Sequence, residues 1–200
     1  DGSLQIMYGL HGEKELPEME LKHWEGYRKS SPVRVGNAAS NQLQLDIYGE
    51  LMDSVYLFNK YGSPISYELW KELQRLLGWV QRHWREADEG IWEVRGGRKH
   101  FVYSKMMCWA TLDRAVKLAE LLGRDGDSAR WIQVAGEIRE EIMLKGWNED
   151  KQAFVQHYDS DNLDASNLMI PFLEFLEPDD PRLLSTIQAI TNELADGPFV

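Results

Sequence analysis

The chain has 200 residues, of which 43% are hydrophobic, and carries a formal net charge of −11 at pH 7. This composition suffices for one domain with a sizeable core, whereas the negative charge argues against a nucleic-acid-binding protein, which would need a basic surface. One cysteine excludes an internal disulfide framework. No apolar run is long enough to span a bilayer, so we expect no membrane partner, and the default expectation is a cytoplasmic location.

The first forty residues contain no long periodic segment. One or two short extended pieces are expected around Gly9 and Gly12, and residues 32–42 (PVRVGNAASNQ) are expected to lead irregularly into the first helix. We interpret this part of the chain as a loop decorated with polar and aromatic side chains.

From residue 40 onward, hydrophobic residues recur with helical spacing. Ser66, Asp127 and Asp180 are suited to cap helix N-termini, and Gly123 is suited to end a helix. The stretch 104–123 is nearly apolar all round in its first half, so it is expected to be an inner helix. The expected helices cover residues 40–60, 66–84, 104–122, 127–145 and 180–194, with a kinked or short helix in 164–176, where Pro171 interrupts an apolar stretch.

The links between these helices alternate between short and long. Residues 61–65, 123–127 and 176–180 are short links, which join antiparallel neighbours. Residues 85–103 and 145–163 are long links rich in aromatic and charged residues. The pattern predicts an all-α fold of stacked helical hairpins, in which the long links share one end and carry the functional groups.

The loop 88–105 (DEGIWEVRGGRKHFVYSK) sets Glu93 between Trp92 and Val94. Two interpretations follow from its residues. Glu93 could form a surface ion pair with Arg95, which the loop alone favours, or apolar neighbours could raise the pKa of its carboxyl group. A protonated carboxyl near neutral pH is what glycosidic cleavage requires of a general acid. In that case Arg95 and Arg98 must point elsewhere, for example toward the acidic residues at the start of the loop.

Three segments, 32–54, 89–115 and 154–169, resemble successive parts of glycoside hydrolase family 15, which comprises glucoamylases, glucodextranases and bacterial trehalases. The resemblance implies that residues 1–200 are part of a single (α/α)6-barrel catalytic domain, with portions missing before residue 1 and after residue 200. It places the general base and an Arg-Asp glucose-binding pair in those missing portions. The chain alone is therefore expected to be inactive.

The resemblance assigns Glu93 as general acid. Gln44 and Asp46 match a polar pair at the start of an inner helix, and their spacing lets only one of them reach a pocket, with Asp46 favoured. A hydroxyl-binding role and a loop-stabilising role are equally open for the loop residues Arg34 and Asn37. Asp164 matches a family carboxylate, but helix capping is its expected task. The candidate substrate-binding residues are Trp92, Asp46, Arg34, Asn37 and Gln44.

The leading functional interpretation is an inverting, exo-acting glycosidase that resembles glucan 1,4-α-glucosidases and releases glucose from an oligosaccharide or disaccharide. Val94 replaces a second glutamate common in glucoamylases, and NAASNQ lacks their usual tryptophan, so the α-glucan substrate is in doubt. The alternatives are a trehalase of the same family, a non-catalytic carbohydrate-binding helical module and a helical interaction scaffold. The five histidines are scattered, so no metal site is predicted, and no cofactor is implied. The sequence gives no indication of the oligomeric state.

Overall fold

Five α-helices form the body of the molecule in the computed structural model, which describes residues 2–94, 96–197 and 199–200. They are α1 (Asp46–Tyr61), α2 (Tyr67–His83), α3 (Val102–Leu122), α4 (Ser128–Lys145) and α5 (Pro181–Leu194). The short 3-10 helix η3 (Ala165–Met169) precedes Pro171, as the interrupted apolar stretch predicted. The all-α prediction is confirmed.

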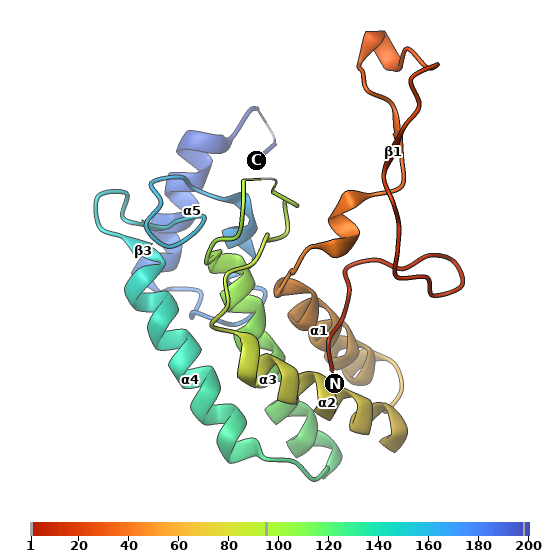
Figure 1. Ribbon diagram of the computed structural model, residues 1–200. Coiled ribbons are helices and arrows are strands. Elements are labelled where there is room, and N and C mark those ends of the chain that lie inside the picture. The colour runs from red at the N-terminus through yellow and green to blue at the C-terminus, as the bar shows by residue number, and fades with distance from the viewer. Residues whose placement is uncertain (1, 95, 198) are drawn as a thin grey trace.

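Helix α3 lies between α1 and α4, and each of these neighbours belongs to an antiparallel hairpin (Figure 1). Every residue of α3 from Val102 to Leu112 is buried, which confirms the inner position predicted from its apolar sequence. The close approach of α1 depends on Gly49, because a Cβ atom at that position would stand 2.4 Å from the carbonyl oxygen of Met107.

Local capping sets the helix ends as predicted. The side chains of Ser66, Asp127 and Asp180 each accept a hydrogen bond from a backbone N–H in the first turn of α2, α4 and α5. Gly123 adopts the left-handed conformation, with φ 58°, and ends α3.

The first helix begins at Asp46 rather than near residue 40, so the predicted start is wrong. Residues 38–41 instead form the separate 3-10 helix η2 (Ala38–Asn41). The stretch between the two helices is held by another loop: the backbone N–H groups of Leu43 and Leu45 donate to the carboxylates of Glu89 and Asp88 at 2.7 and 2.9 Å. Because these N–H groups bond to the loop, they do not take part in hydrogen bonds within a helix.

The two long links lie at the same end of the helices, as predicted. The N–H of Val102 donates to the carbonyl of Gln156 at 3.0 Å, and the N–H of Tyr158 donates to the carbonyl of His100 at 3.0 Å. Within the second link, β3 (Trp147–Asn148) pairs antiparallel with β4 (Ala153–Phe154). The links after α1 and α3 lie at the opposite end (Figure 1).

The first forty residues differ in detail from the expectation. Gly9 and Gly12 form a turn, closed by a hydrogen bond of 2.9 Å from the N–H of Gly12 to the carbonyl of Gly9. The paired strands lie further along, where β1 (Met19–Glu20) pairs antiparallel with β2 (Arg34–Val35). They flank the 3-10 helix η1 (Tyr27–Lys29) in an arm that projects away from the helices (Figure 1).

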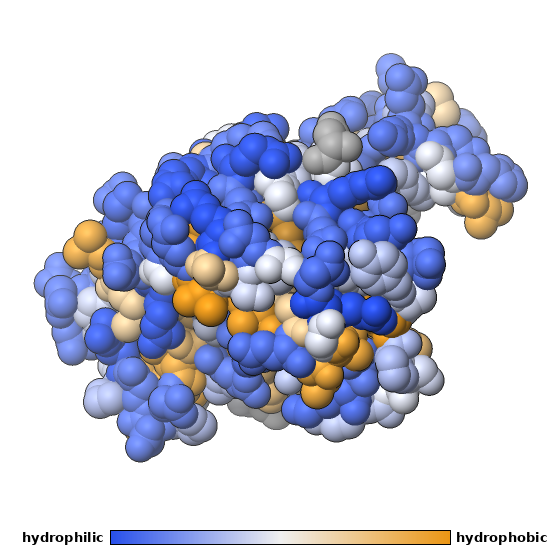
Figure 2. Space-filling model, turned by 90° about the horizontal axis from the view of Figure 1, so that it is seen from below, coloured by the Kyte–Doolittle hydropathy of each residue, from blue (hydrophilic) through white to orange (hydrophobic). Residues whose placement is uncertain are grey.

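Hydrophobic patches break the hydrophilic surface on the face seen from below (Figure 2). Large hydrophobic side chains that stay exposed in the described chain include Leu57, Phe58, Tyr61, Leu144 and Phe172. The described helices include none with the length and apolarity needed to cross a membrane.

Candidate active site

The loop that carries Trp92 and Glu93 is anchored at its base by Asp88. The Asp88 side chain is fully buried and accepts the hydrogen bond from the N–H of Leu45 just before α1. Its backbone pairs with Lys99 in both directions, at 2.9 and 2.8 Å, which closes the loop. Burial raises the pKa of the Asp88 carboxyl group above its usual range.

Glu89 holds the next part of the loop. One carboxylate oxygen accepts from the N–H of Leu43 at 2.7 Å, and the other accepts from Nε of Arg98 at 3.0 Å. The Arg98 guanidinium therefore points to Glu89 rather than Glu93, as the general-acid interpretation requires. The alternative ion pair of Glu93 with Arg95 lies outside the described residues.

A buried lysine of α3 clamps the beginning of the loop. The ammonium group of Lys105 donates to the carbonyl of Trp84 at 2.6 Å and to the carbonyl of Glu86. Its side chain has no exposed surface, and this desolvation lowers its pKa. Lys105 was not among the predicted site residues, although a lysine inside the apolar run SKMMCWA indicates a buried, hydrogen-bonded cation.

Trp92 and Glu93 differ in how firmly they are held. Trp92 is 56% exposed, yet its indole N–H donates to both carboxylate oxygens of Asp164, at 3.0 and 2.9 Å. Glu93 is exposed and adopts a left-handed backbone conformation, with φ 51°. The described chain therefore does not supply the apolar enclosure that we expected Trp92 and Val94 to provide around this carboxylate.

Asp46 is the most strongly perturbed carboxyl group among the predicted site residues. Its side chain is 3% exposed at the first position of α1. Desolvation by burial, with smaller contributions from the negative charges of Asp88 and Glu50, raises its pKa to about 7. One carboxyl oxygen, Oδ1, finds no hydrogen-bond partner among the described residues. This oxygen is itself buried, so in the described chain it is not open to a ligand, and a substrate-binding role for Asp46 stays a prediction.

Gln44 is buried two residues before Asp46. Its amide nitrogen donates to the amide oxygen of Gln42 at 3.1 Å, and the amide nitrogen of Gln42 donates to the carbonyl of Val94 at 3.4 Å. Gln44 thus supports the segment that contacts the residue after Glu93.

Arg34 and Asn37 are engaged within their own part of the chain. Nε of Arg34 lies 3.0 Å from a carboxylate oxygen of Glu18, and another guanidinium nitrogen lies 3.4 Å from Glu20. The side chain of Asn37 accepts from the N–H of Ala39 at 2.9 Å and caps η2. These contacts are loop-stabilising, and a substrate-binding role for either residue stays a prediction.

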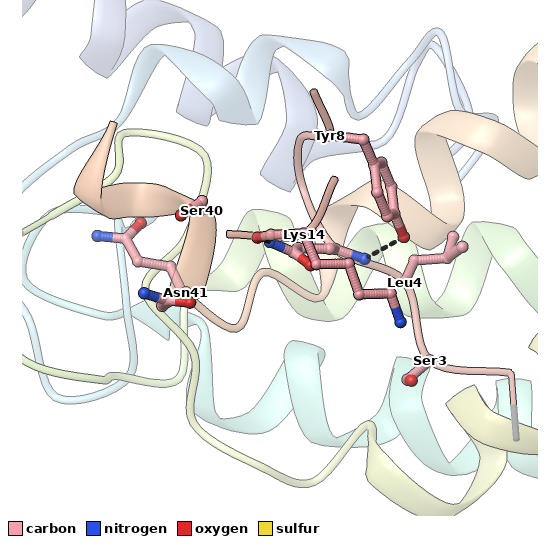
Figure 3. A pocket seen from close by; sticks show the side chains of 8 residues that line it. Ser3, Leu4, Tyr8, Lys14, Ser40 and Asn41 are labelled. Carbon is pink, nitrogen blue, oxygen red and sulfur yellow. Dashed lines mark hydrogen bonds between the residues drawn. The ribbon is translucent and has the colours of Figure 1, made fainter. Parts of the chain in front are cut away.

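A polar cleft of about 260 Å³ lies between the N-terminal segment and η2 (Figure 3). The close-up shows Lys14 extending from the N-terminal segment between Tyr8 and Ser3, while Ser40 and Asn41 come from η2. None of the described residues that line the cleft carries a carboxylate, in contrast to the acidity of the whole chain. Because Gln42 both lines the cleft and contacts Val94, the cleft adjoins the loop of Trp92 and Glu93. Its lining residues are Ser3, Leu4, Gln5, Tyr8, Lys14, Ser40, Asn41 and Gln42.

The cysteine is buried, and no metal-binding group is found in the described part of the chain. Cys108 is fully buried, and burial raises the pKa of its thiol to about 12. Within residues 2–94, 96–197 and 199–200, no group of three or more His, Cys, Asp or Glu side chains is placed to hold a metal ion.

The capping role expected of Asp164 is confirmed, since its carboxylate accepts from the N–H of Ser166 at 2.9 Å.

Comparison with known proteins gives one family and several relatives. The model of the family described as Glycosyl hydrolases family 15 matches residues 1–200. The trehalase of Mycobacterium tuberculosis is 45% identical over 197 residues, covering 98% of this chain and 29% of that protein. Trehalase 1 of Sulfolobus acidocaldarius is 37% identical over 199 residues, covering 98% of this chain and 34% of that protein. The trehalase of Thermoplasma volcanium is 36% identical over 198 residues, covering 98% of this chain and 32% of that protein. The chain thus spans about a third of the length of these relatives.

Solved structures show the same fold. A glycosidase in complex with glucose superposes with a TM-score of 0.68 at 20% identity, covering 86% of this chain and 47% of that chain. A second glycosidase structure gives a TM-score of 0.68 at 22% identity with the same coverage.

Proposed function

Because this chain belongs to family 15 of the glycosyl hydrolases, we propose that residues 1–200 form part of the single catalytic domain of a trehalase, which hydrolyses the bond joining the two glucose units of trehalose. The observation that carries this proposal is the similarity to proteins named trehalase along 98% of the chain, at up to 45% identity. It favours the trehalase alternative over the glucoamylase-like interpretation. Val94, and the absence of a tryptophan in NAASNQ, agree with a leaving group other than an α-glucan.

Glu93 is the general acid of the proposed reaction. It lies at the end of the helices where the two long links meet, on a loop anchored by Asp88, Glu89 and Lys105. In this role its carboxyl group protonates the bridging oxygen as the bond to the anomeric carbon breaks. The neighbouring indole of Trp92 offers an exposed aromatic surface for a sugar ring.

Sugar binding is assigned to groups that surround this loop. The cleft beside Gln42 offers hydroxyl, amide and ammonium groups that can hydrogen-bond to sugar hydroxyls. Asp46 is a candidate from the family resemblance alone, because its carboxyl group is buried in the described chain. A carboxylate outside residues 1–200 acts as the general base in this proposal, following the resemblance to inverting enzymes.

The proposal is tested with the full-length protein and trehalose, maltose and dextran in parallel. Trehalose should release glucose far faster than the other two substrates. Glu93→Gln keeps size and polarity but cannot donate the proton, so turnover should fall by about 10²–10⁴-fold while the free energy of unfolding stays unchanged. Glu177→Gln, in an exposed link between η3 and α5, is the matched control and should keep full turnover.

Each other outcome has a definite meaning. Faster cleavage of maltose than of trehalose would restore the glucoamylase-like interpretation. A Glu93→Gln variant that loses stability but keeps its rate would favour the ion pair with Arg95. Binding of trehalose without any turnover in the parent protein would favour the non-catalytic carbohydrate-binding module.

A further inference from the structure

An exposed indole of the loop is tied to a buried carboxylate of the second long link. Trp92 is 56% exposed, whereas Asp164 is 5% exposed, and the two are 72 positions apart in the sequence. The indole Nε1–H lies 3.0 and 2.9 Å from the two carboxylate oxygens. A hydrogen bond from an N–H to a carboxylate is stronger than one between neutral groups, so this contact can hold an aromatic ring that packing leaves half free.

Asp164 is itself held on a rigid base. Its Oδ1 accepts from the N–H of Ser166 and caps η3. The buried side chain of Asn167 then ties η3 to the second link, because its amide donates to the carbonyls of Phe154 and Val155 at 3.2 and 3.1 Å. The acceptor for the indole is therefore held by contacts that do not involve Trp92.

The residue after Trp92 needs such support. Glu93 has φ 51°, a conformation that residues with a side chain adopt only where their surroundings compensate the strain. Within the described chain, the backbone contact at Glu93 is a hydrogen bond of 3.2 Å from its N–H to the carbonyl of Gly90. The anchored indole of Trp92 is the neighbouring restraint.

We propose that Asp164 is a positioning residue, which fixes the orientation of Trp92 and, through the shared backbone, that of the proposed acid Glu93. The cap of η3 and the tie to Trp92 are two tasks of one carboxylate. The role in turnover rests on the proposed function, whereas the fixing of the indole does not.

Four variants of the full-length protein separate these tasks. Asp164→Ser can still cap η3, since serine is a good N-cap, but its shorter side chain cannot reach the indole. Asp164→Asn keeps one oxygen that can accept from both N–H groups, but it removes the negative charge and places an amide donor where Oδ2 lies 2.9 Å from the indole nitrogen. Trp92→Phe keeps an aromatic ring and removes the donor. Asp180→Ser makes the same Asp-to-Ser exchange at the N-cap of α5 and is the matched control.

The kinetic result expected is a loss in kcat that exceeds any change in KM for trehalose. Asp164→Ser and Trp92→Phe should each lower kcat by up to about 10²-fold, which is the cost of misplacing a reacting group by about 1 Å. The double variant should lose no more than the worse single variant, because both remove one interaction. The rate of Asp164→Asn should lie between those of the parent protein and Asp164→Ser, and Asp180→Ser should leave the rate unchanged. Losses that multiply in the double variant, or an equal loss in Asp180→Ser, would overturn the proposal.

A spectroscopic readout is independent of turnover. In protein labelled with 5-fluorotryptophan, Trp92→Phe identifies the fluorine resonance of Trp92. Asp164→Ser should shift that resonance toward the solvent-exposed value, whereas Asp180→Ser should not move it. A shifted resonance in a protein that does not cleave trehalose would refute the proposed function and keep the positioning role. An unmoved resonance in Asp164→Ser would refute the positioning role whatever the activity.

Discussion

Two opposing effects act on Asp46 at the beginning of α1. An acid in the first turn of a helix is ordinarily stabilised as the anion by the backbone N–H groups. Here burial outweighs that effect, and the pKa of the carboxyl group rises from 3.8 to about 7. Burial also disfavours the charged form of Lys105, and because this form is the protonated one, desolvation lowers the pKa of its ammonium group. The difference is that Lys105 donates to two carbonyls, whereas Oδ1 of Asp46 finds no partner among the described residues.

The raised pKa of Asp46 predicts a stability that falls with rising pH. Between about pH 4 and about pH 7 the folded chain holds this proton more tightly than the unfolded chain, so its contribution to the free energy of unfolding decreases through that window. Asp46→Asn cannot ionise and should gain stability relative to the parent protein as pH rises, by at most about 4 kcal/mol for a shift of about three pH units. Urea unfolding at about pH 4 and about pH 8 measures the difference. An Asp46→Asn effect of equal size at both pH values would contradict this assignment.

At the scale of the element, Gly49 allows α1 and α3 to pack closely, although a glycine inside a helix by itself lowers the stability of that helix. Glycine in a helix interior costs about 0.5–1 kcal/mol relative to alanine. At Gly49 this cost is offset, because the absence of a side chain lets the backbone of α3 approach α1 at Met107. At Gly136 in α4, no described atom beyond the neighbouring residues and the backbone of the helix itself lies within 4 Å of the place where a Cβ would stand.

The same Gly-to-Ala exchange should therefore have opposite signs at the two positions. Gly49→Ala forces α1 and α3 apart and should destabilise the protein by about 1–3 kcal/mol, as overpacked cores do. Gly136→Ala should stabilise it by about 0.5–1 kcal/mol, because alanine favours the helix. Chemical denaturation of both variants checks this, and a gain in stability for Gly49→Ala would show that the helices are not in such close contact.

At the scale of the whole molecule, the mechanism proposed from the family resemblance fixes the stereochemistry of the products. Both anomeric carbons of trehalose are α. An inverting enzyme attacks one of them with water and releases β-glucose, while the other glucose departs with its α configuration. A retaining enzyme would release only α-glucose. Inversion also requires that Glu93 and the base stand roughly 6.5–9.5 Å apart, against roughly 5–5.5 Å for retention.

The full-length protein should thus give equal amounts of α- and β-glucose from trehalose at early times. Proton NMR distinguishes the anomers before mutarotation mixes them, and in ¹⁸O-labelled water the label should enter only the initial β-glucose. Early product that is entirely α-glucose would refute the inverting mechanism and leave the fold unaffected.

The sequence by itself determined the helices, their caps and the end at which the long links gather. Ser66, Asp127, Asp180 and Gly123 act on backbone groups within one turn of themselves, and helical periodicity is a property of consecutive residues. Such short-range interactions are already present in the order of the amino acids.

Tertiary structure decided the rest, because it depends on which distant groups surround a side chain. The start of α1 moved to Asp46, since Asp88 and Glu89 take the N–H groups of Leu45 and Leu43. The raised pKa of Asp46 and the tie between Trp92 and Asp164 likewise arise from residues far apart in the chain. The exposure of Glu93 could not be read from its apolar neighbours in sequence, because adjacent side chains on a loop need not enclose one another.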